Sequence, residues 1–315
     1  MHCSLSFSTK NALRRKFSLD GGGGLYYNRE KIPARPSAPD EKLRKKDDTM
    51  KIGFIGTGNM GGALASAAAK SAQAELLLAN RTPEKAQALA EAIGARVCDN
   101  AAAAGEADHL FLGVKPQMMA GMLEKIAPVL KAREKKPVLV SMAAGLSIES
   151  IRAMAGGDYP VIRIMPNMPA SVGEGVIFYA CSENCEKADV EAFLSYMAPA
   201  GRLFALEERL QDAGSAVAGC GPAFAAMFLE ALADGGVACG LPRADAIRYA
   251  AQMMLGTAKM VLETNEHPGA LKDRVCSPGG STIQGVRALE TAGLRGAVFN
   301  AVIAAYEKNC DLKNA

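Results

Sequence analysis

Two short stretches of the chain combine glycines with free backbone amides, a pattern that binds anions. In the first, MKIGFIGTGNMGG, three glycines form G-x-G-x-x-G directly after an apolar segment. In this arrangement the glycines permit a tight turn, a close approach to a pyrophosphate, and close packing of helix on strand. The following helix start adds amides and partial positive charge. The pattern predicts a dinucleotide site at Gly56, Thr57, Gly58, Asn59, Met60 and Gly61.

The second stretch, VCSPGGSTIQ (275–284), interrupts a region that otherwise has helical apolar spacing. Proline and two consecutive glycines break a helix, yet the apolar spacing resumes at Ile283. Two interpretations are open. The stretch is either an ordinary helix–helix turn, or a new helix start whose amides bind an anionic group.

A polar triplet, Asn80-Arg81-Thr82, ends the strand expected after the glycine-rich segment. An NAD site usually has an acidic residue about 20 residues after the glycines. Here Arg81 could pair with a 2′-phosphate while its neighbours donate hydrogen bonds. The triplet favours NADPH as cofactor, with NADH as the alternative, in which case Arg81 is simply a surface residue.

Other segments at expected strand ends complete the predicted cofactor site, because ligands of parallel sheets bind outside the carboxyl ends of the strands. Lys115 directly follows an apolar strand and either contacts the cofactor or is a solvated lysine that opens a helix. The remaining candidates are Asn100, Val114, Pro116, Met142, Ala143 and Ala144.

Strands and helices alternate from Met50 to about residue 210, which predicts a Rossmann-type, doubly wound parallel sheet. From 211 to 315 the pattern is all-helical and rich in alanine and glycine. Such a bundle has little core of its own, so we expect it to pack against a second copy. The fold class is therefore α/β, with a sheet domain at 50–210 and a helical substrate and dimerisation domain at 211–315.

Residues 1–49 differ from the rest and are expected to be a disordered extension. They hold 11 basic and 6 acidic residues, against 25 and 27 in the remainder, so the net charge of +3 comes from this segment. The remainder is nearly neutral and gives no sign of a nucleic-acid groove, so no nucleic-acid partner is expected. The extension is interpreted as a transit peptide, an early start codon or an inessential segment.

Eight cysteines occur, and only Cys181 and Cys185 lie close together in the sequence. Their segment CSENC has neither the usual metal-binding spacing nor the redox spacing C-x-x-C. We expect free thiols in a reducing compartment and a cytoplasmic location. No apolar run long enough to cross a bilayer is recognised, so no membrane partner is expected. No metal is expected either, because the cysteine pair lacks a metal-binding spacing.

Six segments together resemble the pyrroline-5-carboxylate reductase family. These segments are GFIGTGNMGGAL, FLGVKP, SMAAG, GCGPAF, ALADGGVACGLPR and HPGALKDRVCSPGGSTI. The resemblance covers about residues 50–312 without large gaps. It implies reduction of the cyclic imine 1-pyrroline-5-carboxylate to L-proline by hydride transfer to the imine carbon, the last step of proline biosynthesis. It also implies homodimers that interlock through C-terminal helices and often join into decamers.

The resemblance assigns the second stretch to the substrate carboxylate. Ser277 and Pro278 would bend the chain so that the amides of Gly280, Ser281 and Thr282 converge on the carboxylate. In the family, a threonine hydroxyl at the position of Thr282 contacts the ring nitrogen, which makes Thr282 the candidate catalytic residue. An iminium needs no strong protein acid, in keeping with the lack of an obvious basic histidine.

Some positions depart from the family pattern, and two rival functions stay open. Arg274 stands where some members carry a neutral amide, and either Glu263 or Glu266 could take the place of a substrate-side glutamate. A β-hydroxyacid dehydrogenase would use a helical lysine, for which Lys259 is the candidate. A non-enzymatic NADPH sensor would bind the cofactor without any need for Thr282.

Overall fold

The computed structural model describes residues 49–71 and 74–313, with side chains up to residue 311. Within them, eight strands form one sheet in the order β3-β2-β1-β4-β5-β6-β7-β8. The strands are β1 (Met50–Ile55), β2 (Ala74–Ala79), β3 (Arg96–Val97), β4 (His109–Leu112), β5 (Val138–Ser141), β6 (Val161–Met165), β7 (Gly175–Cys181) and β8 (Gly201–Ala205). The expected disorder of residues 1–49 lies outside the described residues, apart from Thr49.

The helices alternate with these strands and then continue alone. Around the sheet they are α1 (Asn59–Lys70), α2 (Pro83–Ile93), α3 (Asn100–Glu106), α4 (Pro116–Ala132), α5 (Ile148–Ala155) and α6 (Lys187–Met197). Later ones are α7 (Gln211–Gly214), α8 (Gly221–Ala238), α9 (Arg243–Thr264), α10 (Pro268–Val275), α11 (Ser281–Thr291) and α12 (Leu294–Lys313). Short turns are η1 (Met168–Val172), η2 (Ala198–Ala200), η3 (Glu208–Leu210) and the π-helical η4 (Ser215–Gly219).

The first six strands are all parallel and lie in the order 3-2-1-4-5-6, which confirms the Rossmann-type sheet. Strand β7 departs from this parallel set, because it pairs antiparallel with β6. The reason is the connection, which holds only η1 and its flanking residues. A parallel crossover needs about a dozen residues or more, so this short link returns the chain in the opposite direction.

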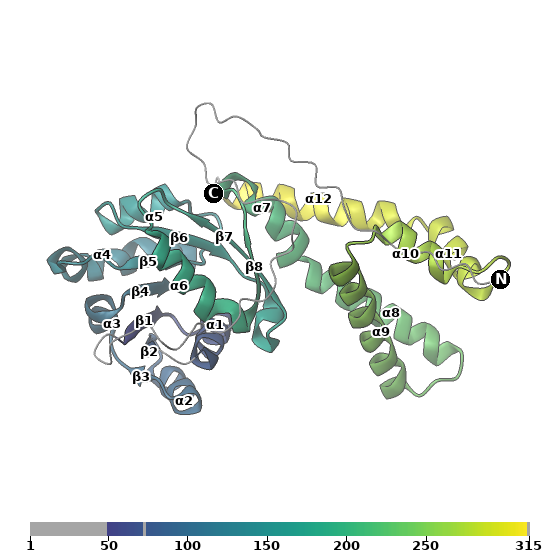
Figure 1. The fold of residues 1–315 in the computed structure, drawn as a ribbon, viewed down its shortest axis with the longest axis horizontal. Coiled ribbons are helices and arrows are strands. Elements are labelled where there is room, and N and C mark those ends of the chain that lie inside the picture. Colours follow the sequence, from purple (N-terminus) through teal and green to yellow (C-terminus); the bar gives the residue numbers. More distant parts are fainter. Residues whose placement is uncertain (1–48, 72–73, 314–315) are drawn as a thin grey trace, which may run out of the picture. The chain divides into compact units, whose positions relative to one another are not determined.

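Apolar side chains cover both faces of the sheet. On one face, buried residues of α1, α2 and α6 pack with Phe54 and Phe111, whose rings stack at 4.4 Å between centroids. On the other face, α3, α4 and α5 pack over Leu110 and Leu139. Figure 1 shows these helices around the sheet in purple to teal. The sheet is therefore a rigid central layer whose strand ends position the loops that follow them.

Two of these helices, α3 and α5, were not expected from the sequence. The carboxylate of Asp99 accepts a hydrogen bond from the Ala102 amide at 2.7 Å, which caps α3. The Ser147 hydroxyl accepts one from the Ser150 amide at 3.0 Å and caps α5. Both caps are visible in the sequence as Asp or Ser before a short run, but helices of one or two turns give little periodicity to detect.

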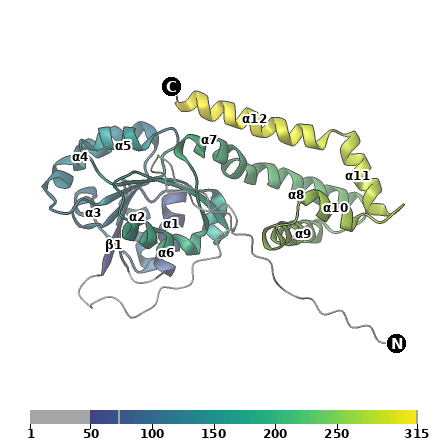
Figure 2. The same cartoon turned by 45° about the horizontal axis from the view of Figure 1, so that its top comes forward.

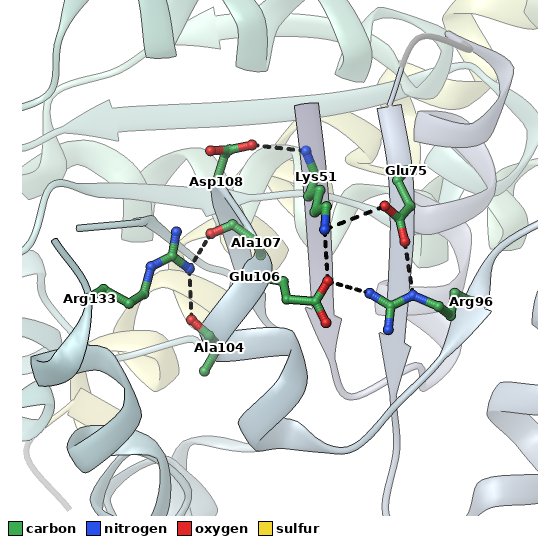
Figure 3. A network of polar contacts seen from close by, with 8 residues as sticks. All are labelled: Lys51, Glu75, Arg96, Ala104, Glu106, Ala107, Asp108 and Arg133. Carbon is green, nitrogen blue, oxygen red and sulfur yellow. Dashed lines mark hydrogen bonds and ion pairs between the residues drawn. The ribbon is translucent and has the colours of Figure 1, made fainter. Parts of the chain in front are cut away.

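An ionic network joins the amino ends of β1, β2 and β3 to the end of α3 (Figure 3). The Glu106 carboxylate accepts from Lys51 Nζ at 2.8 Å and from Arg96 at 2.6 Å, and Arg96 also contacts Glu75 at 2.9 Å. The hydrogen bonds from Arg96 and then Lys51 lower the pKa of Glu106 to about 2. The network lies at the amino edge of the sheet, opposite to the edge that carries the glycine-rich turn.

The chain after residue 220 is helical, as expected, and it is punctuated by glycines. Helices α8 and α9 pack against each other. Figure 2 shows α11 and α12, in yellow, meeting at an angle. Between them Gly293 has a φ of +74°, a conformation that residues with a Cβ rarely adopt, so α11 cannot continue straight into α12.

Little of this helical region is buried within one chain. From residue 221 onward, the only buried side chains among the described residues are Ala233, Ala246, Ala250 and Leu271. Large apolar side chains are exposed instead, and Met227 and Phe299 have relative exposures of 70% and 67%. Exposed apolar surface on this scale marks a site where another surface packs.

One sequence expectation about membranes is wrong as stated. The described residues contain one segment, Glu208–Ala238, whose length and composition would allow it to cross a bilayer. Its most apolar 18-residue stretch has a mean hydropathy of 1.6, and 11% of that stretch is buried within the described structure. Length and composition alone do not place a helix in a membrane, since apolar helices of soluble proteins pass the same test.

Candidate dinucleotide and substrate site

The glycine-rich turn after β1 has the geometry that its sequence predicts. Gly56 has a φ of +98°, and its amide donates to the Ala79 carbonyl at 2.8 Å. A Cβ on Gly61 would collide with the Gly56 carbonyl oxygen. The first and third glycines are therefore required by backbone conformation and by the close approach of α1 to the turn.

A fourth glycine, Gly113, belongs to the same turn and was missed in the sequence. Its amide donates to the Ile55 carbonyl at 2.8 Å, and a Cβ on it would collide with the Gly56 carbonyl oxygen. A Cβ on Gly56 would in turn lie 2.5 Å from the Gly113 carbonyl oxygen. The available signal was a glycine directly after a buried strand, β4, next to β1 in the parallel sheet.

The residues at the start of α1 fit a bound pyrophosphate. Gly58 is the N-cap and gives no side-chain cap, so the first-turn amides of α1 have no side-chain partner. A Cβ built on Gly58 would meet no heavy atom within 4 Å, which leaves space beside the backbone. The Thr57 hydroxyl is buried without a hydrogen-bond partner in the described residues. These features together accommodate an anionic ligand at the helix start.

The triplet Asn80-Arg81-Thr82 follows β2 at the same edge of the sheet. The Asn80 side-chain amide donates to the Thr82 carbonyl at 3.1 Å, which shapes the turn into α2. Arg81 and Thr82 are exposed, and Arg81 forms no ion pair with the described residues. The Arg81 guanidinium is thus free to pair with a ligand phosphate.

Parallel pairing of β1 to β5 brings the predicted cofactor residues to one edge of the sheet. Val114, Lys115 and Pro116 follow β4, and Lys115 is exposed as the N-cap residue of α4. Met142, Ala143 and Ala144 follow β5. Asn100 begins α3 just after β3.

The second stretch forms a turn and a new helix start, as expected. Gly279 has a φ of +68°, and Gly280 is the N-cap of α11 without a side-chain cap. The amide of Gly280 donates to the Ser277 carbonyl at 3.0 Å. The expectation that this amide faces an anion is therefore not supported here, because it already closes the turn. The first-turn amides, including those of Ser281 and Thr282, have no side-chain cap.

The structure leaves this second turn open to solvent. Ser277, Ser281 and Thr282 are exposed. No hydrogen bond or ion pair of the described residues joins residues 276–282 to the glycine-rich turn at 56–61. The candidate substrate residues are thus adjacent to one another but are not covered by other parts of the same chain.

Charged residues near this turn pair with each other. Arg274 contacts Glu266 at 3.0 Å between Nη2 and Oε2, and Lys259 contacts Glu263 at 3.6 Å along α9. Arg274 and Glu266 therefore act as one ion pair in this structure. Lys259 is mostly exposed on α9 and pairs with Glu263 one turn away. These surroundings are those of an ordinary surface lysine and give no support for a role in acid–base chemistry.

The two described histidines are structural. His267 caps α10, where its Nδ1 accepts from the Gly269 amide at 3.1 Å. His109 is fully buried in β4, with Nδ1 at 2.8 Å from the Tyr196 hydroxyl. Within the described residues, no group of three or more His, Cys, Asp or Glu side chains could hold a metal ion.

Comparison with known proteins gives a consistent result over both halves of the chain. The sequence model described as pyrroline-5-carboxylate reductase dimerisation matches residues 208–312. A second model, described as NADP oxidoreductase coenzyme F420-dependent, matches residues 51–145. Pyrroline-5-carboxylate reductase of Escherichia coli is 40% identical over 263 residues, which are 82% of this chain and 97% of the relative. The chain belongs to the pyrroline-5-carboxylate reductase family.

Further relatives and solved structures agree. The reductase of Glycine max is 37% identical, over 84% of this chain and 97% of its own length. The crystal structure of Plasmodium falciparum pyrroline carboxylate reductase with NADP bound is 31% identical, with a TM-score of 0.73 over 82% of this chain and 97% of that chain. The Coxiella burnetii reductase structure is 30% identical, with a TM-score of 0.78 over 84% and 99%.

Family membership confirms the function inferred from the six segments. The chain is an oxidoreductase that uses NAD(P)H to reduce 1-pyrroline-5-carboxylate to proline, in proline biosynthesis. The match to the dimerisation model also supports assembly with copies of itself. Its fold, a Rossmann-like sheet followed by a helical dimerisation domain, is the one expected from the sequence.

Proposed function

We propose that the reduction takes place between two helix starts, with the cofactor at α1 and the substrate at α11. When bound, NADPH supplies the hydride that reduces the imine carbon. The glycine-rich turn and the uncapped amides of α1 hold its pyrophosphate. Residues after β4 and β5, including Lys115 and Ala143, hold the part of the cofactor nearer the substrate.

The observation that carries the substrate assignment is the uncapped start of α11. The substrate is a small ring with one carboxylate, and first-turn amides together with the helix dipole favour a carboxylate at this position. The amides of Ser281 and Thr282 are the proposed donors. Gly279 and Gly280 contribute by turning the chain and keeping side chains away from the approach.

Thr282 is the proposed catalytic residue. Its hydroxyl can donate to or accept from the ring nitrogen, which fixes the imine relative to the cofactor. The hydroxyl is exposed at the start of α11 and makes no hydrogen bond to the described residues. Positioning of this kind makes catalysis depend on geometry rather than on a strong acid.

We also propose NADPH as the preferred cofactor, since Arg81 can pair with a 2′-phosphate. The proposed assembly is a homodimer formed by the helices after residue 210. The domain border near residues 210 and 211 is supported by the end of β8 at Ala205. We further propose that such dimers join into a decamer. We also propose a cytoplasmic location, because all seven described cysteines are free thiols.

The direct test compares the parent with Thr282→Ala by following NADPH oxidation in the presence of 1-pyrroline-5-carboxylate. We expect kcat to fall by roughly 10²-fold, the scale on which loss of a positioning group acts. The matched control is Thr291→Ala at the other end of α11, where the hydroxyl donates to the Arg287 carbonyl at 2.9 Å.

Three outcomes are distinguishable. A large loss in Thr282→Ala with normal turnover in Thr291→Ala supports both the site and the role. Equal turnover in both variants removes Thr282 from the chemistry and leaves the reductase function intact. A folded parent that binds NADPH without turnover would instead favour the sensor.

A further inference from the structure

The Glu208 carboxylate connects the start of the helical region to the end of a loop in the sheet domain. Glu208 begins η3, and its Oε1 accepts a hydrogen bond from the Ile148 amide at 2.8 Å. Ile148 is the first residue of α5, directly after the loop of residues 142–147 that follows β5. A carboxylate at this position satisfies a helix-start amide and lies at the positive end of the helix dipole. Glu208 therefore holds one end of that loop.

A buried arginine holds Glu208 in place. Arg163 of β6 is 1% exposed, and its Nη1 donates to the same Glu208 oxygen at 3.0 Å. Its Nη2 lies 3.9 Å from Asp212 Oδ1, so two carboxylates from η3 and α7 face one buried guanidinium. Separating a buried charge from its partners is strongly unfavourable. The guanidinium therefore restrains the Glu208 side chain.

Further hydrogen bonds tie the same strand to the helices that follow. The Gln211 side-chain amide donates to the Arg163 carbonyl at 3.3 Å, and both residues are buried. The Asn309 side chain of α12 donates to the Asp212 carbonyl at 3.2 Å. The loop of residues 142–147, strand β6 and helices α7 and α12 are thus joined by one connected set of polar contacts.

We propose that Glu208 is a positioning residue for hydride transfer, because it fixes the loop of residues 142–147 from the side of the helical region. This role rests on the proposed function, in which residues after β5 hold the part of the cofactor nearer the substrate. The pyrophosphate is held elsewhere, at the glycine-rich turn. Displacement of the loop should therefore misalign the reacting carbon of the cofactor without releasing the cofactor.

The experiment follows hydride transfer in a single turnover, with the full chain in excess over NADPH and with saturating 1-pyrroline-5-carboxylate. Glu208→Ala should lower the rate constant by about 10-fold, since small displacements of reacting groups are costly. The steady-state KM for NADPH should change by less than about 2-fold. A purely structural role would reduce the amount of active enzyme and leave the rate constant unchanged. Glu208 lines an open surface hollow with Ser147 and Arg209, so water can replace the lost carboxylate and the variant should fold.

Two matched variants separate the hydrogen bond from other effects. Glu208→Gln keeps an acceptor for the Ile148 amide, so its rate constant should stay within about 3-fold of the parent. Glu207→Ala removes the neighbouring carboxylate, which is 61% exposed and accepts from Arg209 Nε at 2.8 Å, and should leave the rate constant unchanged. A loss in either variant as large as that in Glu208→Ala would contradict a role for the hydrogen bond to the loop.

Ser147→Ala is a second test, and it leaves the Arg163 pair intact. The Ser147 hydroxyl accepts from the Ser150 amide at 3.0 Å and so caps the same helix start from within the loop. Its removal should also slow hydride transfer, because the helix start is loosened. An unchanged rate constant in Ser147→Ala would overturn the proposal even if Glu208→Ala failed to fold.

Ala144→Leu distinguishes a failure of the role of Glu208 from a failure of the proposed cofactor placement. Ala144 is exposed in the same loop, so the added side chain would obstruct the nicotinamide and slow hydride transfer. A rate constant that is lowered by Ala144→Leu but unchanged in Glu208→Ala would overturn the role of Glu208 alone. Unchanged rate constants in both variants would overturn the cofactor placement as well.

Discussion

At the scale of single residues, the proposed chemistry depends on a few exposed groups at the ends of regular elements. Arg81 has no ion-pair partner in the described residues, and Thr282 is exposed at a helix start. Neither side chain supports the core, since both lie outside the two buried clusters. Substitutions at these positions should therefore change ligand binding or turnover without lowering the free energy of unfolding by much.

The cofactor preference can be tested at Arg81. Arg81→Ala should raise KM for NADPH by roughly 10-fold or more and leave KM for NADH nearly unchanged, because a charge-assisted hydrogen bond to a phosphate contributes about 1.5–3 kcal/mol. The control is Lys70→Ala at the far end of α1, away from the strand ends that hold the cofactor. An equal rise of KM for both cofactors would contradict a role in reading the 2′-phosphate.

At the scale of elements, the amino edge of the sheet gains stability from the Glu106 network. Its side chains are about a third or more exposed, so solvent screening limits the contribution to roughly 0.5–1 kcal/mol. The pKa of Glu106 is lower in the folded chain than the ordinary 4.5. The stabilisation is therefore present above about pH 4.5 and is lost as the pH falls through about 2.

Glu106→Gln tests this network. We expect the free energy of unfolding at pH 7 to fall by roughly 0.5–1 kcal/mol, with the difference from the parent shrinking below about pH 4 as the parent carboxylate takes up its proton. Denaturant titrations of the parent and the variant at several pH values measure this difference in the free energy of unfolding. Glu124→Gln, on the exposed face of α4, is the matched control. If the stability difference between parent and variant grew as the pH fell, the Glu106 carboxylate would not be the source of the stabilisation.

Some of the structural elements could be predicted from the sequence alone, and others could not. The turn at Gly56 and the start of α11 were predictable because local backbone chemistry decides both. The reversed direction of β7 follows from its short connection to β6. That length is visible in the sequence, but the residue pattern of the strands themselves does not record their direction. The role of Gly113 depends on the neighbouring strand, which is a tertiary effect.

At the scale of the whole molecule, the exposed helical region and the open substrate turn point to the same requirement. Only four described side chains after residue 220 are buried, and α9 exposes Ile247 and Leu255 at 51% and 57%. A second copy packed on these helices would cover the apolar surface and enclose the start of α11. We therefore expect activity to depend on assembly.

Leu255→Asp tests that dependence. A charge introduced into a buried interface should weaken the dimer on the order of 100-fold or more, since two unpaired carboxylates must be desolvated. Light scattering should show monomer, and turnover should fall with it. The control Gln252→Asp introduces the same charge at an exposed polar position of α9. A monomer with full turnover would show that one chain completes its own site.

The sparse core after residue 220 also has a consequence for how the protein is made. On the proposed dimer, a newly synthesised chain can finish its sheet alone, but its later helices gain their full stability only on meeting another copy. The supply of sister chains then sets the yield of mature enzyme. When synthesis is slow, unpaired chains keep their apolar helical surfaces exposed for longer, so chaperones and proteases have more time to bind or degrade them.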